Sequence, residues 1–212
     1  MVTKSLLLAV GLAMTATAVL AKPVVEVRQL PAFSRIEITD ITDIDVKVGE
    51  SQSFSLAADD QQIAKIVTEV KGDTLIISIR GEYNSYKVKS SPRATITIPQ
   101  LRSLSLVGTG DATVTNLQGK EFDLSLIGTG DATITGSIDK VLVSLTGTGD
   151  ANLNNLKVRD ANVSVTGTGD AKVNVSGVLT AAGSGTGDIV YMGSPKIVRK
   201  SNTGTGDIKA TN

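Results

Sequence analysis

The chain alternates apolar and polar residues with a period of two over much of its length. Between residues 104 and 115, the even-numbered positions are apolar or very small, and the odd-numbered ones are polar except for Val107. The same alternation returns around Leu124, Val143 and Val163. Because successive side chains of a β-strand point to opposite faces, this pattern predicts strands with one buried face and one exposed face.

A four-residue phrase, Gly-Thr-Gly-Asp, punctuates the alternation six times. It begins at Gly108, Gly128, Gly147, Gly167, Gly185 and Gly204, in steps of 20, 19, 20, 18 and 19 residues. Self-similarity at a fixed period predicts a stack of equivalent units. Antiparallel hairpins would need chain reversals and half this period, whereas a coil of parallel strands needs only bends. We therefore predict an all-β fold, a right-handed parallel β-helix or β-solenoid, with about six regular rungs of 18–20 residues over 101–212.

The region before the repeats, residues 33–100, keeps the alternation without the phrase. We expect irregular rungs there, within a single β-helix domain that covers 22–212. Residues 57–71 fit either a short helix or a loosely alternating strand. The run Lys71-Gly72-Asp73-Thr74 predicts a hairpin, because Gly and Asp tolerate the positive φ of tight turns.

The last rung departs from the others at its inward positions. Lys200 and Asn202 stand where earlier rungs have Leu or Val. An open sheet edge pairs readily with another molecule unless charged or polar residues prevent it. We expect these two side chains to protect the C-terminal end of the stack.

The longest polar interruption, residues 81–93, is the first candidate for an interaction site. It carries two tyrosines and three positive charges: Tyr83, Tyr86, Lys87, Lys89 and Arg93. A solvated loop is the simpler interpretation. Contact with an anionic partner is the functional one, because loops on a rigid scaffold often carry binding residues.

The N-terminus has the features of a secretory signal peptide over residues 1–21. Lys4 precedes a short apolar block from Leu6 to Ala13, and a tract of small residues ends at Ala21. The apolar block is too short for a membrane span, and no second such block follows. We expect an exported protein without a membrane span after cleavage, in the periplasm or at the surface of a bacterium.

Composition excludes several classes of function. The chain has 21 basic and 21 acidic residues, so it lacks the charge excess expected of a nucleic-acid binder. Histidine and cysteine are absent, which excludes His-based triads, thiol nucleophiles and His/Cys metal or haem sites. We predict no cofactor.

The phrase itself places six acids at equivalent positions: Asp111, Asp131, Asp150, Asp170, Asp188 and Asp207. Stacked about 4.8 Å apart, neighbouring carboxylates would repel by about 1 kcal/mol even in water. The structural explanation is that each carboxylate accepts a backbone N–H within its own bend. The alternative is a column of bound calcium ions, since calcium prefers oxygen ligands.

Two further functions fit this sequence poorly. Outward threonines can bind ice, but the neighbouring columns change to Asn152, Asn154 and Lys172, so no uniform threonine face persists. A polysaccharide lyase or hydrolase on a β-helix would use clustered acids and sugar-stacking aromatic residues. The acids here recur evenly and the chain has no Trp, so we predict no catalytic residues and no enzyme.

The final repeats, from Gly185 to Lys196 and from Ser201 to Ile208, resemble the bacterial family "putative auto-transporter adhesin, head GIN domain". The earlier Gly-x-Gly-Asp phrases, the turn from Lys71 to Leu75 and the strand from Ala94 to Leu101 share the resemblance. It implies an exported parallel β-helix, suspected of cell-surface adhesion, with no catalytic residues to transfer. We therefore expect a non-catalytic adhesion or surface-interaction module that contacts a protein or glycan at the cell envelope. Self-association into a homo-oligomer is left open. The alternatives are the polysaccharide-acting enzyme and a calcium-stabilised structural solenoid.

Overall fold

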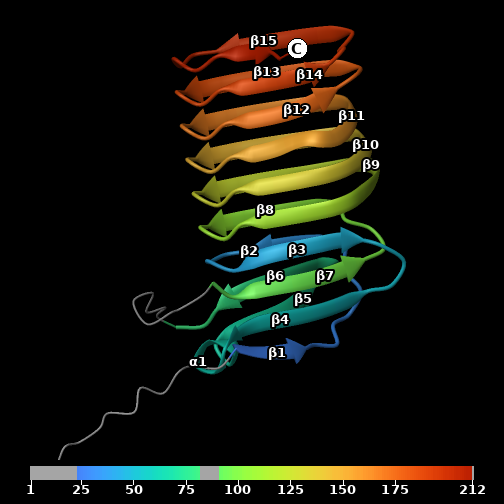
Figure 1. The fold of residues 1–212 in the computed structure, drawn as a ribbon, viewed down its shortest axis with the longest axis vertical. Coiled ribbons are helices and arrows are strands. Elements are labelled where there is room, and N and C mark those ends of the chain that lie inside the picture. Colours follow the sequence, from blue (N-terminus) through green and yellow to red (C-terminus); the bar gives the residue numbers. More distant parts are fainter. Residues whose placement is uncertain (1–22, 82–90, 212) are drawn as a thin grey trace, which may run out of the picture.

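The structure, a computed structural model, describes residues 23–81 and 91–211, and about two thirds of them lie in β-strands. Successive turns of the chain lie one above another, from the N-terminal part at one end to the C-terminus at the other (Figure 1). This is the parallel β-solenoid that the repeat predicts.

The N-terminal part holds seven strands and one short helix: β1 Pro23–Val27, β2 Arg35–Ile38, β3 Asp43–Val48, β4 Ser53–Asp59, α1 Asp60–Ile63, β5 Ile66–Lys71, β6 Thr74–Ile79 and β7 Arg93–Ile98. The repeat region holds nine strands: β8 Ser103–Gly108, β9 Ala112–Gly128, β10 Ala132–Gly147, β11 Ala151–Gly167, β12 Ala171–Val175, β13 Val178–Gly185, β14 Ile189–Gly193, β15 Ile197–Asn202 and β16 Ile208–Ala210.

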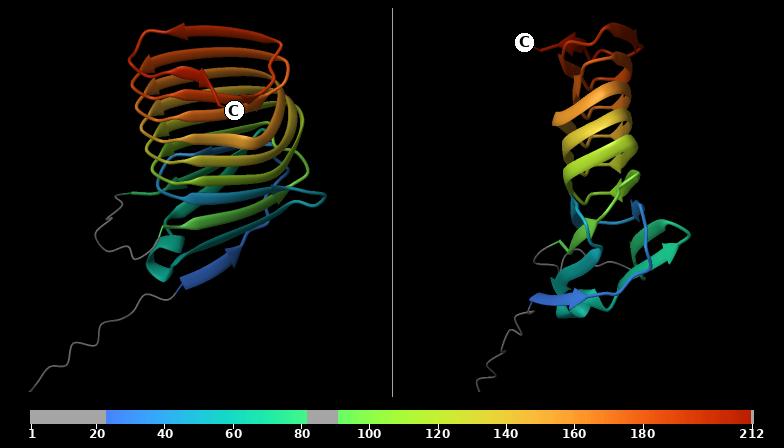
Figure 2. Two further views of the ribbon diagram at one scale, coloured as in Figure 1. Left: turned by 45° about the horizontal axis from the view of Figure 1, so that its top comes forward. Right: turned by 90° about the vertical axis from the view of Figure 1, so that its right-hand side faces the viewer.

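These strands build two walls that face each other across the core. The first wall has the order β1-β4-β7-β3-β9-β10-β11-β12-β14-β16. The second follows the pairings β5-β6-β2-β8-β9-β10-β11-β13-β15. The long strands β9, β10 and β11 bend from the first wall into the second. Seen from the side, the turns therefore form a narrow stack (Figure 2).

Neighbouring turns pair in parallel and in register. Val143 lies between Leu124 and Val163, and Gly147 lies between Gly128 and Gly167. The number of turns differs slightly from the expectation, since the stack has about five rather than six.

The core consists of columns of aliphatic side chains between the walls. One column contains Leu124, Val143, Val163 and Ala181, all at most 1% exposed. Phe122 is completely buried beside them. Burying an aliphatic side chain stabilises a fold by about 1.5–3 kcal/mol, so each turn depends on the turns above and below it.

The N-terminal part does not stack in sequence order. Strands β2 and β3 form the turn directly beneath β8 and β9, with Ile36 opposite Leu104 and Ile44 opposite Ala112. Strands β6 and β7 come later in the chain but lie one level farther from the repeats, because β6 pairs with β2 and β7 with β3. The irregular region is therefore an interleaved base.

Antiparallel strands close this base. β4 pairs antiparallel with both β1 and β7, and β5 with β6. The β5–β6 pair is the hairpin expected at Lys71–Thr74, where Gly72 has φ 63°. Residues 57–71 contain both structures that the sequence left open, namely helix α1 and strand β5.

Arg28 ties the two walls together beneath the core. Its guanidinium donates hydrogen bonds to the Ile66 carbonyl at 2.9 Å and to the Thr68 hydroxyl at 3.1 Å, both on β5. It also pairs with Glu26 on β1 at 3.0 Å. The side chain is only 17% exposed, so it covers the end of the core.

The C-terminal end is closed differently, by polar residues at inward positions. Lys200 is aligned with Ala181, and Asn202 with Gly183. The Lys200 ammonium donates to the Ile208 carbonyl at 2.8 Å and lies 4.9 Å from the centre of the Tyr191 ring. Asn202 donates to the Gly206 carbonyl. The last turn thus ends the hydrophobic columns where the sequence suggested.

Candidate functional site

The Gly-Thr-Gly-Asp bends form one edge of the solenoid, where the chain crosses from the second wall to the first. The backbones of successive bends approach so closely that a Cβ atom on Gly149 would lie well under 3.0 Å from the carbonyl oxygen of Gly130. The first position of the phrase needs glycine for a second reason. Gly147 has a φ of 126°, a backbone conformation that residues with a side chain rarely adopt. Glycine is therefore needed at both positions of the phrase.

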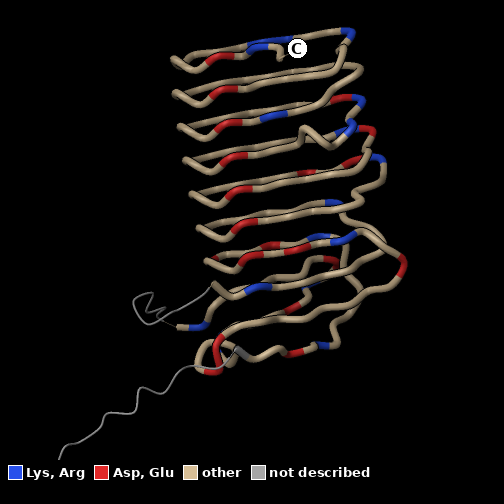
Figure 3. The backbone as a smooth tube through the Cα atoms, in the orientation of Figure 1, with Lys and Arg blue, Asp and Glu red and all other residues tan. Residues whose placement is uncertain are grey.

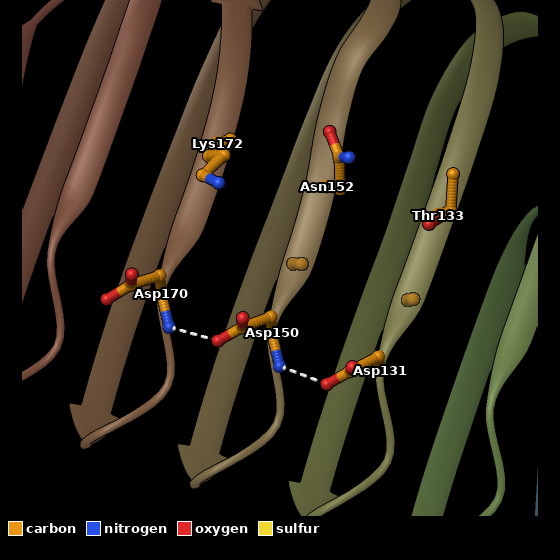
Figure 4. A pocket seen from close by; sticks show the side chains of 8 residues that line it. Asp131, Thr133, Asp150, Asn152, Asp170 and Lys172 are labelled. Atoms are coloured by element: carbon orange, nitrogen blue, oxygen red, sulfur yellow. Dashed lines mark hydrogen bonds between the residues drawn. The ribbon is translucent and has the colours of Figure 1, made fainter.

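The aspartates of the phrase form a continuous hydrogen-bonded ladder along this edge. In each step, the Oδ1 atom of one aspartate accepts the backbone N–H of the aspartate in the next turn. The N···O distances run from 2.7 to 3.1 Å, through Asp43, Asp111, Asp131, Asp150, Asp170, Asp188 and Asp207. Figure 4 shows the two steps between Asp131 and Asp170.

The expected bond within each aspartate's own bend is therefore wrong. The carboxylate reaches the next turn because the parallel register places that N–H about one strand spacing away. The aspartate ladder joins turns, and it offsets the mutual repulsion of the carboxylates with a charge-assisted hydrogen bond at every step.

The ladder begins one turn earlier than the repeated phrase. Its first member, Asp43, ends the run Asp40-Ile41-Thr42-Asp43, which forms the bend beneath Gly108–Asp111. This bend lacks both glycines, so the repeated phrase did not predict it. The fourth-position aspartate and the spacing to an apolar alternation at Ile44 and Val46 were the available signals.

A column of outward side chains runs beside the ladder on the first wall. It comprises Asp45, Thr113, Thr133, Asn152, Lys172, Val190 and Lys209. We call the ladder and this outward column the aspartate face. Between residues 131 and 172 this face is hollowed by a shallow depression of about 180 Å³, lined by side chains from three successive turns. In Figure 4, Thr133, Asn152 and Lys172 lie beside the aspartates on these turns.

Charge is concentrated along the ladder, where acids recur at the same place in successive turns (Figure 3). At its C-terminal end, the Asp207 N–H and then the Lys209 ammonium, 2.7 Å away, hold the pKa of Asp188 below its usual value. The hydrogen bond to Asp188 raises the pKa of Lys209.

Arg93 lies at the start of the ladder. Its guanidinium contacts Asp45 at 2.8 Å and Asp43 at 3.1 Å. The hydrogen bond to Asp45 raises the pKa of Arg93. Arg93 thus neutralises the first acids of the aspartate face. The other members of the proposed interaction loop, Tyr83, Tyr86, Lys87 and Lys89, lie outside the described residues.

The described residues give the calcium hypothesis no geometric support. Within 23–81 and 91–211, no group of three or more acidic side chains is placed to hold a metal ion. The ladder also uses one oxygen of each carboxylate from Asp43 to Asp188 for a backbone N–H. What this face offers chemically is a regular array of carboxylate oxygens, hydroxyls and amides, with the ammonium groups of Lys172 and Lys209, suited to many hydrogen bonds with an extended partner.

No helix in the described part of the chain is long and apolar enough to cross a membrane.

Comparison with known proteins gives a consistent picture. Residues 32–195 match the model of a family described as "Putative auto-transporter adhesin, head GIN domain". A crystal structure described as a putative adhesin from Bacteroides fragilis NCTC 9343 is 25% identical, with a TM-score of 0.73 over 90% of this chain and 97% of that one. No match was found among curated proteins.

Two more distant structures share the fold, both from Parabacteroides distasonis ATCC 8503. A putative adhesin is 18% identical with a TM-score of 0.58, covering 90% of this chain and 98% of that one. A putative lipid binding protein is 19% identical with a TM-score of 0.52, covering 90% and 97%.

Proposed function

The chain belongs to the family "Putative auto-transporter adhesin, head GIN domain", and from this premise we propose that it is an exported, non-catalytic module for adhesion or surface interaction. Its contacts are made by the aspartate face. The observation that carries the proposal is the arrangement of polar groups there: they recur column by column over several turns.

The partner that suits such a face is long and itself polar, such as an envelope polysaccharide or an extended segment of a protein. A face of this kind makes many modest hydrogen bonds, each contributing about 0.5–1.5 kcal/mol. Affinity then grows with the number of turns that the partner spans. The depression lined by Asn152 and Lys172 lies at the middle of the face.

The binding test uses an array of bacterial surface polysaccharides and the purified protein. The variant N152A/K172A removes two exposed side chains of the aspartate face, and we expect it to weaken binding at least tenfold. The matched control is N155A/K157A, which removes the same residue types from exposed positions at the opposite edge of the stack. Equal binding by wild type and N152A/K172A would show that another surface makes the contacts.

The interaction loop stays part of the proposal and is tested in the same assay. The variant Y83A/Y86A removes the two tyrosines, and loss of binding would place them in the contact. Binding unchanged from wild type would remove them from it.

The proposed location is the periplasm or the cell surface, reached after removal of residues 1–21. N-terminal sequencing of protein from an envelope fraction should begin at Lys22. Protein that retains Met1 and fractionates with the cytoplasm would contradict export.

Both alternative functions have direct tests. For a polysaccharide lyase or hydrolase, incubation with acidic polysaccharides should release new chain ends, and we expect none, since the ladder acids are spaced evenly and not clustered. For a calcium-stabilised solenoid, the melting temperature should rise with calcium and fall with chelator. We expect the melting temperature to stay the same, because a backbone N–H already binds one oxygen of each ladder carboxylate from Asp43 to Asp188.

A further inference from the structure

The middle of the second wall is almost free of charge on its outward side, whereas the neighbouring strands carry Arg35 and Glu37 on β2 and Arg199 on β15. Over β8, β9, β10, β11 and β13, three outward columns stand above the buried ones. They contain Ser103, Asp123, Leu142, Asn162 and Thr180; Ser105, Ser125, Ser144, Ser164 and Ala182; and Val107, Ile127, Thr146, Thr166 and Ser184. We call these fifteen residues the serine face. Asp123 is its one charged member.

Three large apolar side chains on this face are open to solvent. Val107 is 38% exposed, Leu142 is 41% and Ile127 is 46%. The inward neighbours on the same strands are buried, so the fold does not need these side chains for its core. Depletion of charged residues distinguishes the core of a protein interface from the rest of a surface. The serine face has this property and the aspartate face does not.

Charged residues border the serine face along its edge toward the opposite bends. There, Lys140 is aligned with Glu121 and Asp160 on the neighbouring turns, and its ammonium lies 2.7 Å from the Glu121 carboxylate. An uncharged centre with a charged, solvated rim is the usual arrangement of an interface.

The size of the face decides what it can hold. Five strands about 4.8 Å apart and three outward positions about 6.6 Å apart along each strand give roughly 500 Å². Two such surfaces in contact would bury about 1,000 Å², which is at the lower limit for a specific protein–protein interface. The face is therefore large enough for a weak dimer.

We propose that the protein forms a homodimer through the serine face, with the second copy as its occupant. When like faces meet, charges of the same sign meet as well. The repeated carboxylates of the aspartate face would repel their copies, whereas the serine face brings only Asp123 into such a contact. Pairing here also leaves the aspartate face free, so the dimer presents two binding faces and gains avidity for a long partner.

Sedimentation velocity over a wide range of protein concentration tests the dimer. The variant I127K/L142K places two positive charges within the serine face, and like charges should then oppose each other across the contact. The control T113K/T133K adds the same charges at exposed strand positions of the aspartate face. Circular dichroism and thermal melting establish that each variant is folded.

We expect the wild type and the T113K/T133K control to change from monomer to dimer with rising concentration. We expect I127K/L142K to dimerise at least tenfold more weakly. The proposal is overturned if the wild type stays monomeric at every concentration. This holds also if the monomer binds a neutral polysaccharide through the serine face. It is also overturned by a folded I127K/L142K protein that dimerises like the wild type, or by equal weakening in the control. The N152A/K172A binding assay is independent of these results, so the two proposals fail separately.

Discussion

Each turn of the solenoid crosses between its walls twice, and the two crossings are built on different physical principles. At the glycine bends, Gly-Thr-Gly-Asp repeats because the backbones of successive turns stack directly on each other. At the opposite bends, Gly136 is aligned with Leu117 and Leu156, so residues of different size share one level, although the Leu117 carbonyl oxygen lies too close to Gly136 for a Cβ atom there. Side chains bridge the turns there, as in the pair of Lys140 and Glu121. The sequence repeats where every turn stacks backbone on backbone, and it varies where such backbone contact is confined to single positions such as Gly136.

The largest loss of stability is expected when a single methyl group is added at a glycine bend. Gly149→Ala would place a Cβ atom against the Gly130 carbonyl, and we expect a loss of at least about 3 kcal/mol in the free energy of unfolding. This corresponds to a melting temperature about 6–12 °C lower.

The matched change at the opposite bends is Gly119→Ala. Its nearest neighbour would be the Ile138 Cδ1 atom at 3.4 Å, and its φ of 149° adds moderate strain. A loss of about 1 kcal/mol is expected. Similar melting temperatures for the two variants would remove the distinction between the bends.

The next largest effect should come from removing one step of the ladder. Asp150→Ala leaves the Asp170 N–H without its partner at 2.7 Å, which should cost about 1–2 kcal/mol in chemical denaturation. Asp150→Asn keeps an acceptor oxygen and should lose less.

Asp139 at the opposite bends provides the comparison. It lies 3.7 Å from Arg159, and both side chains are more than half exposed. Exposed pairs contribute about 0–1 kcal/mol, so Asp139→Ala should barely change unfolding. The ladder has no special role if Asp150→Ala is equally mild.

Acid should weaken both kinds of bend through one aspartate in each. The Asp207 N–H lowers the pKa of Asp188, and the Val178 N–H lowers that of Asp160, in each case helped by a neighbouring cation. A lowered pKa in the folded state means that the stabilisation is complete above the unfolded value of 3.8 and is lost as the pH falls through the folded one. The melting temperature should therefore drop below about pH 4.

In the double variant D160N/D188N, the melting temperature should fall less steeply with decreasing pH, because neither amide titrates. Melting curves at closely spaced pH values measure it. A drop as steep as that of the wild type would assign acid sensitivity to other groups.

The smallest effect is expected from the exposed ion pairs. Lys140→Gln removes the contact with Glu121, whose side chain is 57% exposed, and should barely change the free energy of unfolding, because water screens exposed ion pairs. High salt should have the same small effect on the wild type. A loss as large as that of Asp150→Ala would mean that side-chain bridges hold the turns as strongly as the ladder.

The period and the alternation were sufficient to predict the solenoid and its interior columns. Val143 and Leu145 alternate with polar neighbours, and parallel stacking is the arrangement that buries such columns at a period near twenty residues. The role of Lys200 and Asn202 at the end of these columns could also be predicted. Polar residues that interrupt a regular apolar column indicate the end of the stack.

The partner of each ladder carboxylate could not be predicted in the same way. Asp150 could reach an N–H in its own bend or in the next turn, and the residue types are identical in both cases. Only the register of the backbone decides between them. The first bend, Asp40–Asp43, was missed because glycine is required only above a preceding bend of the same kind, and this bend begins the series.

The interleaved base was beyond prediction for a different reason. The alternation predicts a half-buried strand for each of β2, β3, β6 and β7. It does not indicate which of these strands pair with each other. Their order depends on contacts between segments far apart in the chain, such as Ile36 with Leu75 and Leu104.

The aspartate ladder has a consequence for how such a molecule can change its length. Each carboxylate serves the turn that follows, and every turn between Asp111 and Asp188 offers the same acceptor to its successor. If one period of the sequence were duplicated, the added turn could make the same carboxylate–N–H hydrogen bonds with the turns on both sides of it. Neither the base nor the terminal turn would need to change. Gene-level gain or loss of single modules would then adjust the reach of the protein in increments of about 4.8 Å.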